Sequence, residues 1–275
     1  MRRVEVMRIG FFDSGIGGLT VLHQALKVLP NEDYLFYADT SHVPYGDKTK
    51  EEVRKYILDA VRFIAEQKVK ALVVACNTAT SIVIEELRER YSFPILGIEP
   101  AVKPAVENPG GLQKKILVLA TKLTLSEKKY HDLVTRLDRE DRVDSLALPG
   151  LVQLAERFEF GGKQAVPYLK QALSSLDLRQ YGTVVLGCTH FPYFERTLRQ
   201  LFPEGVDMIS GSKGTARHLK RLLESNSQTG GGSGDILFYQ SGQKVQDPAL
   251  LSQYHGLFEM LDEIQSYKAI SISQQ

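Results

Sequence analysis

Short, continuously apolar runs alternate with amphipathic stretches along nearly the whole sequence, and this alternation restricts the fold more than any other pattern. The apolar runs predict strands at residues 8–12, 34–38, 71–75, 94–98, 116–120, 143–148, 183–187 and 206–209. Apolar residues on both faces of a strand indicate a sheet that is covered on both sides. Helices are predicted at residues 19–28, 50–67, 78–90, 126–139, 164–176, 193–201 and 213–224. Strands that alternate with helices predict an α/β fold with parallel sheets and right-handed crossovers.

The clearest of these helices follows Thr49. Thr49 and Glu52 have the spacing of a capping box, in which each side chain bonds a free backbone N–H group of the first turn. Val53, Ile57 and Ala60 then recur at intervals of three and four residues, which predicts one apolar face for the helix.

The length of 275 residues corresponds to about two domains at ~150 residues per domain, or to one large α/β unit. Residues 99–115 are rich in proline and glycine and have the composition of a boundary. Residues 225–234 (Ser-Asn-Ser-Gln-Thr-Gly-Gly-Gly-Ser-Gly) are predicted to form a flexible linker. A further strand at 236–240 and an amphipathic helix near 249–266 are predicted to follow it.

Composition excludes several classes of protein. The sum of Lys and Arg is 34 and that of Asp and Glu is 33, so the chain lacks the basic field that would make nucleic acid its main partner. No apolar run approaches the ~20 residues needed to cross a membrane, and the stretch before Asp13 is too charged and too short for a signal peptide. We therefore expect a cytoplasmic protein whose two cysteines, Cys76 and Cys188, stay reduced.

The polar residues best suited to chemistry directly follow predicted strands. They are Asp13-Ser14, Asp39-Thr40-Ser41, Cys76-Asn77-Thr78, Thr121 and Cys188-Thr189-His190. The carboxyl ends of parallel strands are where α/β proteins bind their ligands. Helix N-termini also favour Ser, Thr and Asn as caps, which gives Asn77, Thr78 and Thr189 a structural explanation. That explanation does not account for the two cysteines.

The segments around Cys76 and Cys188 share one layout, in which an apolar strand is followed by the cysteine, by small polar residues and by a helix. This repetition indicates two similar halves that each place a thiol at a strand end. A helix N-terminus stabilises a thiolate, His190 follows Cys188 closely, and Asp13 is predicted to approach Cys76. A disulfide and a pair of acid–base thiols are both compatible with the sequence. The lack of a Cys-x-x-Cys spacing argues against a metal site.

A second interpretation applies to residues 13–20 (Asp-Ser-Gly-Ile-Gly-Gly-Leu-Thr), which imitate part of a dinucleotide-binding fingerprint. Thr20 stands where that fingerprint requires Gly or Ala, and Asp13 would repel a pyrophosphate, so a nicotinamide cofactor is not expected. The same glycines can present backbone N–H groups to a small anion. Pro44-Tyr45-Gly46 is a turn that can cover such a ligand.

The remaining histidines and one acidic residue have structural interpretations that need no functional role. His23, His131, His218 and His255 lie on or beside helical patterns and are predicted to be solvated. Glu156 is followed by Arg157, which fits a surface ion pair.

Five motifs together resemble the glutamate racemases of the aspartate/glutamate racemase superfamily. They are Phe11-Phe12-Asp13-Ser14-Gly15-Ile16-Gly17-Gly18, Asp39-Thr40 with Pro44-Tyr45-Gly46, Val74-Ala75-Cys76-Asn77-Thr78-Ala79, Gly97-Ile98-Glu99-Pro100 and Leu186-Gly187-Cys188-Thr189-His190-Phe191-Pro192. They occur in the family's order from residue 9 to residue 193, whereas residues 225–275 match loosely and residues 1–7 are extra.

The resemblance implies two pseudo-symmetric α/β domains, each a mostly parallel sheet flanked by helices, with the active site in the cleft between them. The first domain would contain residues 1–100 and a returning segment, residues 211–275, and the second would contain residues 101–210. Members of this family interconvert L- and D-glutamate without a cofactor and supply D-glutamate for peptidoglycan. The resemblance also suggests a homodimer whose domains close over the substrate.

By the same resemblance, Cys76 is the base that acts on D-glutamate and Cys188 is the base that acts on L-glutamate, with Asp13 and His190 assisting their respective thiols. The substrate-binding residues that it implies are Asp13, Ser14, Tyr45, Gly46, Asn77, Thr78, Thr121, Thr189 and His190. Glu156 matches a family acid near the second thiol, although the glycine that usually follows closely is absent here.

These residue types suit such chemistry on their own. Inversion of a carbon centre by proton transfer needs a base on one face and an acid on the other, and a thiol can serve as both near neutral pH. If each sulfur lies ~3–3.5 Å from the reacting carbon, the two sulfurs are roughly 6–7 Å apart in the closed complex. Two alternatives remain, namely a related racemase acting on aspartate or a hydantoin, and a non-catalytic anion-binding protein that uses the same cleft.

Overall fold

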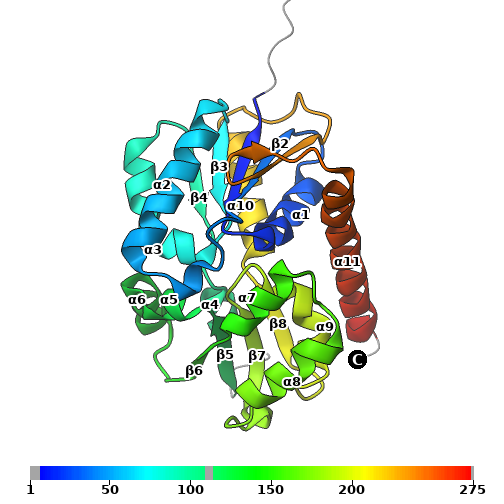
Figure 1. Ribbon diagram of the computed structural model, residues 1–275. Helices are drawn as coiled ribbons and strands as arrows, with labels where there is room; N and C mark the ends of the chain where they lie inside the picture. Colours follow the sequence, from blue (N-terminus) through cyan, green and yellow to red (C-terminus); the bar gives the residue numbers. More distant parts are fainter. Residues whose placement is uncertain (1–6, 109–113, 274–275) are drawn as a thin grey trace, which may run out of the picture.

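The computed structural model describes residues 7–108 and 114–273, which form two α/β units, one above the other in Figure 1. The first sheet has the strand order β10-β9-β2-β1-β3-β4 and the second has the order β6-β5-β7-β8. The strands of the first sheet are β1 (Ile9–Asp13), β2 (Tyr34–Ala38), β3 (Ala71–Val74), β4 (Ile95–Gly97), β9 (Ile236–Gln240) and β10 (Gln243–Lys244). Those of the second are β5 (Lys115–Ala120), β6 (Val143–Ala147), β7 (Tyr181–Leu186) and β8 (Asp207–Ser210).

The two sheets repeat one arrangement. The order β2-β1-β3-β4 in the first unit corresponds to β6-β5-β7-β8 in the second, and every neighbouring pair is parallel except β9 with β10. Cys76 follows β3 and Cys188 follows the equivalent strand β7, within two residues of the strand end. The predicted α/β fold with two pseudo-symmetric halves is therefore confirmed.

Helices cover both faces of the sheets (Figure 1). They are α1 (Leu19–Val28), α2 (Lys50–Glu66), α3 (Asn77–Arg90), α4 (Val102–Val106), α5 (Lys122–Ser126), α6 (Lys128–Leu137), α7 (Pro149–Glu156), α8 (Gly162–Ala172), α9 (Glu195–Arg199), α10 (Ser212–Ser225) and α11 (Pro248–Ser273), with the 3₁₀ turns η1 (Ile16–Gly18), η2 (Tyr45–Asp47), η4 (Leu178–Gln180) and η5 (Phe191–Phe194). Phe11 and Phe12 are neighbours on β1, yet they belong to separate clusters on opposite faces and both are fully buried. Burial on both faces explains why this strand is apolar without alternation.

The capping box at the start of α2 is confirmed, with the Glu52 N–H donating to Thr49 Oγ1 at 3.3 Å and the Thr49 N–H donating to Glu52 Oε2 at 3.0 Å. The helix predicted at 126–139 is observed as α6, and the short helix α5 just before it was not predicted; Glu127, with an extended backbone (φ −74°, ψ 137°), separates the two. The short helices α4 and α7 were not predicted, since five and eight residues give too little periodicity.

The prediction of a flexible linker at residues 225–234 is wrong. Two carboxylates on the turn before β2 accept hydrogen bonds from this segment. Glu32 accepts from the Gly230 N–H at 2.6 Å, and Asp33 accepts from the Ser233 N–H at 2.8 Å. Composition indicated a segment without contacts of its own, whereas these bonds come from residues some 200 positions away in the sequence. We call residues 225–234 the strap.

His23 is also not solvated, because α11 covers α1 at this point. Its side chain is buried, its Nε2 lies 3.0 Å from Asp262 Oδ1, and its ring stacks on Phe258. The predictions for the other helical histidines are confirmed, since all three are exposed; these are His131, His218 and His255.

Some predictions lie outside the described residues. These are the amino-terminal residues 1–6 and the part of the predicted 99–115 boundary that spans 109–113. Within residues 7–108 and 114–273, no helix has both the length and the apolar character needed to cross a membrane.

Candidate active site

A small cavity lies where the carboxyl ends of the strands of both units meet. It is lined by Ser14, Tyr45, Gly46, Cys76, Asn77, Thr78, Thr121, Val152, Cys188, Thr189 and His190. The cavity volume is about 10 Å³, room for about one water molecule, and the lining side chains of Tyr45, Cys76 and His190 are all buried, so the site is closed. The structure thus brings together the predicted site residues, except that Asp13 lies fully buried behind the lining. Val152, contributed by α7, was not predicted because nothing in its local sequence distinguishes it from a core valine.

Cys76 forms the amino-terminal cap of α3. Its sulfur accepts from the Ala79 N–H at 3.4 Å and lies 3.9 Å from Ser14 Oγ. Burial and the nearby Asp13 carboxylate raise the pKa of the Cys76 thiol, because both disfavour a second negative charge in the closed site. In this closed form Cys76 therefore holds its proton.

Asp13 ends β1 and links the two units. Its Oδ1 accepts from the Gly15 N–H at 2.9 Å and its Oδ2 accepts from Thr189 Oγ1 at 3.0 Å. Burial raises the pKa of Asp13 to about 6, although His190 and these hydrogen bonds oppose the rise. The carboxyl group therefore titrates close to neutral pH, which suits a group that assists proton transfer.

Cys188 belongs to a different chain of contacts. Its sulfur lies 3.6 Å from His190 Nδ1, and His190 Nε2 lies 2.5 Å from Glu156 Oε1. Burial lowers the pKa of His190, but Cys188 and Glu156 outweigh that effect and raise it well above the ordinary value. A charged imidazole beside a cysteine is an arrangement that activates thiols as bases and nucleophiles.

The interpretation of Glu156 as a surface partner of Arg157 is wrong. The Glu156 carboxylate also accepts from the Ile16 N–H at 2.8 Å, so it joins the second unit to the glycine-rich loop of the first. Arg157 pairs instead with Glu159 at 3.2 Å. Glu156 ends α7, which turns its side chain inward toward His190.

Three threonine hydroxyls close the other side of the cavity. Thr78 Oγ1 lies 2.9 Å from both Thr121 Oγ1 and Thr124 Oγ1, and the last two are also 2.9 Å apart. Thr78 lies in α3 of the first unit, whereas Thr121 and Thr124 belong to the second, so the triangle crosses between the units. Thr124 was not predicted, because the family motifs do not include it and a threonine within a short helix gives no distinct signal.

Both cysteines are free, so the disulfide alternative is not formed. Among the described residues there is no cluster of three or more His, Cys, Asp or Glu side chains arranged to hold a metal ion.

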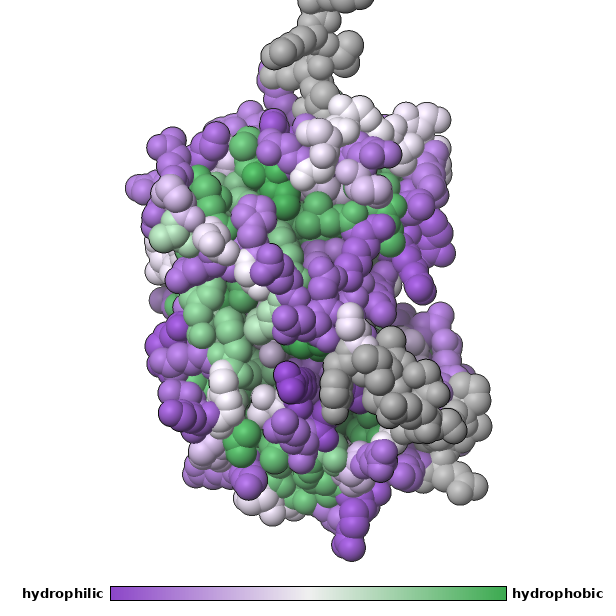
Figure 2. Space-filling model, turned by 90° about the vertical axis from the view of Figure 1, so that its right-hand side faces the viewer, coloured by the Kyte–Doolittle hydropathy of each residue, from purple (hydrophilic) through white to green (hydrophobic). Residues whose placement is uncertain are grey.

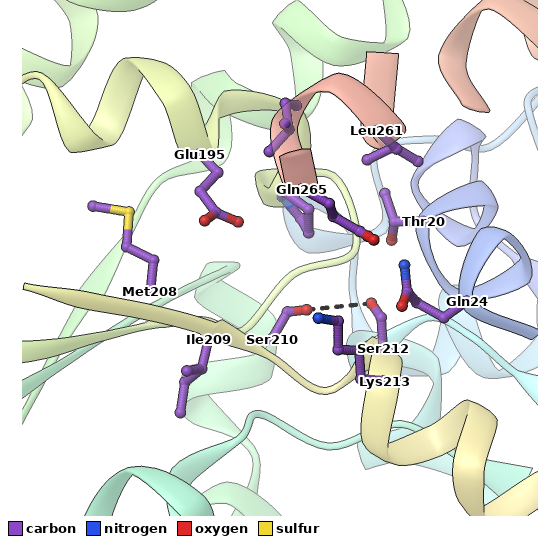
Figure 3. Close-up of a pocket in the computed structure, with 12 residues that line it drawn as sticks. Thr20, Gln24, Glu195, Met208, Ile209, Ser210, Ser212, Lys213, Leu261 and Gln265 are labelled. Carbon is purple, nitrogen blue, oxygen red and sulfur yellow. Dashed lines mark hydrogen bonds between the residues drawn. The ribbon is translucent and has the colours of Figure 1, made fainter. Parts of the chain in front are cut away.

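A roomier cavity of about 150 Å³ lies behind the site, between α1, α10 and α11 (Figure 3). Its lining consists of Thr20, Gln24, Pro192, Glu195, Met208, Ile209, Ser210, Ser212, Lys213, Leu261, Ile264 and Gln265. Ser210 bonds Ser212 at 3.4 Å, drawn as a dashed line in Figure 3, and Thr20 Oγ1 donates to the carbonyl oxygen of Thr189 at 3.0 Å. This cavity contains neither cysteine, so we place the chemistry in the smaller, closed pocket.

The raised pKa of Asp13 gives a stability prediction. Between pH ~4 and ~6 the folded chain keeps the Asp13 proton while the unfolded chain has released it, so stability falls as the pH rises through this window. Asp13→Asn removes the titration and keeps an acceptor for the Gly15 N–H. We expect the variant to gain up to ~3 kcal/mol in unfolding free energy over the wild type at pH 7.5 and almost nothing at pH 4. Urea unfolding at both pH values checks this, and a difference that does not change with pH would contradict it.

Comparison with known proteins gives a consistent answer. Residues 20–219 match the family model described as Asp/Glu/Hydantoin racemase. The chain is 59% identical over 259 residues to glutamate racemase 2 of Bacillus subtilis, covering 94% of this chain and 98% of that protein. It is 56% identical to the glutamate racemase of Halothermothrix orenii, covering 94% and 100%.

Solved structures agree with the sequence matches. The crystal structure of Escherichia coli glutamate racemase in complex with L-glutamate and an activator matches this chain with a TM-score of 0.79. The two are 30% identical, and the match covers 91% of this chain and 96% of that one. The family model covers well over half of the chain, and the sequence relatives are covered nearly end to end. The chain therefore belongs to the Asp/Glu/hydantoin racemase family, among the glutamate racemases.

Proposed function

We propose that this protein interconverts L- and D-glutamate by two-base proton transfer, with Cys76 and Cys188 as the two catalytic residues. The observation that carries the proposal is that two free thiols from equivalent strands line one closed pocket, each with its own acid–base neighbour. The sequence relatives named glutamate racemases at 59% and 56% identity support glutamate as the substrate.

The reaction on this proposal has two proton transfers. With L-glutamate, the Cys188 thiolate takes the α-proton, and the electron pair of the broken C–H bond is delocalised into the α-carboxylate. The Cys76 thiol then gives its proton to the opposite face of the same carbon, which leaves D-glutamate and a Cys76 thiolate. D-glutamate reacts by the reverse sequence, so each thiol acts as base in one direction and as acid in the other.

The neighbours of the thiols support this division of work. His190, bonded to Cys188 and Glu156, stabilises a negative sulfur on one side. Asp13 raises the pKa of Cys76 and so favours the protonated sulfur from which a proton is delivered on the other side. Negative charge that develops on the substrate needs preorganised donors, and we assign that role to the hydroxyl, amide and backbone groups of Ser14, Tyr45, Gly46, Asn77, Thr78, Thr121 and Thr189. The unpartnered, buried Oδ1 of Asn77 is available for an ammonium group.

We extend the proposal to the setting of the enzyme. The product D-glutamate would serve peptidoglycan synthesis, and two reduced cysteines suit a reducing compartment such as the cytoplasm. We place the domain boundaries near residues 100 and 210, where the chain passes between the sheets. We also propose a homodimer. This is the assembly that the resemblance to the glutamate racemases suggests; the face in Figure 2 shows only small apolar areas among polar residues, and among the described residues Met7 is the one large apolar side chain that is exposed.

The proposal predicts that the purified protein, with no added cofactor, makes the circular dichroism signal of L-glutamate decay to zero. The signal of D-glutamate should decay likewise, because the same thiols serve both directions. L-aspartate is the matched control, since it differs by one methylene group and tests the alternative substrate. Faster decay with aspartate would replace glutamate as the substrate, and no decay with either amino acid would favour the non-catalytic alternative.

A further inference from the structure

The turn between β9 and β10 contains a serine in a conformation that favours glycine. Ser241 has φ +44° and Gly242 has φ +85°, the signs of the two-residue hairpin turn in which both central positions are left-handed. Glycine adopts this conformation at no steric cost, and a serine does so less readily. The backbone alone would therefore be served better by glycine at position 241, so the side chain needs a separate explanation.

The hydroxyl of Ser241 bridges two groups of the loop that follows β2. It accepts from the Ser41 N–H at 3.0 Å and donates to Asp39 Oδ1 at 3.1 Å. The bridge is possible because β9 pairs in parallel with β2, with Gln240 opposite Ala38, which brings the turn after β9 beside the loop after β2 (Figure 1).

Asp39 connects the Ser241 hydroxyl to the residues that line the cavity. Asp39 is buried; its carboxylate also accepts from the Tyr45 hydroxyl at 2.6 Å and lies 2.8 Å from His42 Nδ1. Tyr45 and Gly46 both line the closed pocket. Gly46 packs so tightly against the second unit that a Cβ added to it would lie 2.8 Å from Thr121 Cβ. A small shift of this loop would therefore change the shape of the pocket.

We propose that Ser241 is a positioning residue for substrate binding. Its hydroxyl fixes Asp39 and Ser41, and these hold the Tyr45–Gly46 segment at the substrate pocket. The returning carboxyl-terminal hairpin is then part of the support of the active site as well as an edge of the sheet. This inference rests on the proposed function, because it takes Tyr45 and Gly46 as substrate-binding residues.

Two substitutions separate the hydroxyl from the backbone. Ser241→Gly removes the hydroxyl and relieves the left-handed strain, whereas Ser241→Ala removes the hydroxyl and keeps the strain. We expect both variants to raise KM for glutamate by about three- to tenfold, which corresponds to the net free energy of one ordinary hydrogen bond. We expect kcat to change by less than about twofold, because the thiols are untouched. The melting temperature should be higher for the glycine variant than for the alanine variant.

Ser266→Ala is the matched control, because this exposed serine of α11 bonds only a carbonyl oxygen of its own helix and should leave KM unchanged. Unchanged KM in both Ser241 variants would overturn the proposal. It would also be overturned if KM rose only in the variant with the lower melting temperature, since that pattern indicates a purely structural role. Wild-type racemisation in the same assay separates either result from a failure of the proposed function.

Discussion

Replacement of Cys76 or of Cys188 with serine is expected to lower kcat for glutamate racemisation at least ~10³-fold in both directions. A hydroxyl is a far weaker acid than a thiol, so serine cannot take or give the α-proton near neutral pH, and positioned acid–base groups contribute up to about 10⁴-fold in rate. Both directions fail together because every turnover uses both sulfurs. Circular dichroism of L- and D-glutamate measures the loss.

The two variants also distinguish the faces of the substrate. With Cys76→Ser, the remaining Cys188 can still remove the proton of L-glutamate and return one from the same face. We therefore expect slow exchange of the α-hydrogen of L-glutamate for deuterium in D₂O, without inversion, and the reverse preference for Cys188→Ser. Proton NMR follows this exchange. Racemisation at the wild-type rate in either variant would rule out the two-base mechanism, and equal exchange of both enantiomers would rule out the assignment of faces.

The second large effect is expected for Gly17→Ala. A Cβ at position 17 would lie 2.5 Å from both His190 Nδ1 and Thr189 Oγ1, so the methyl group acts as a wedge between the glycine-rich loop of the first unit and the strand end of the second. His190 is buried and bonded on both sides, so it has little room to yield. We expect a loss of about 1–3 kcal/mol in unfolding free energy from overpacking. A displacement of about 1 Å at His190 would lower kcat/KM by roughly 10²-fold.

Gly214→Ala is the matched control. A Cβ there would meet nothing within 4 Å, and the residue lies in α10, where alanine is the better helix former. We expect this variant to be fully active and more stable by ~0.5–1 kcal/mol. Urea unfolding and steady-state kinetics, measured well below the melting temperature, compare the two variants. Wild-type kinetics for Gly17→Ala would show that the contact between the units is not needed for catalysis.

Sequence reasoning succeeded where the relevant signal is local. The apolar runs located the strands because both sheet faces are buried, and the positions of Cys76 and Cys188 after two such runs placed both thiols at strand ends. The capping box of Thr49 and Glu52 could also be predicted from the sequence, because both residues lie within one helical turn.

It failed where a residue acts through a distant partner. The residues beside Glu156 suggest a surface ion pair with Arg157, and only the family resemblance places it near the second thiol; its carboxylate contacts Ile16, which is 140 positions away, and His190. Thr124 and Ser241 are ordinary hydroxyl residues until the fold brings distant segments of the chain beside them. Local composition cannot show such contacts, since they depend on how the two units dock and on where the chain returns.

The strap has a consequence for the order of folding during synthesis. The strands β5 to β8 and their helices are contiguous in the chain, so the second unit can be completed soon after its last strand leaves the ribosome. The first unit is made earlier, but its strands β9 and β10 and the strap that engages Glu32 and Asp33 are among the last segments to emerge. Until then, β2 exposes an unpaired edge, and Glu32 and Asp33 lack the backbone donors of the strap. The half of the molecule that is translated first is thus the half that matures last.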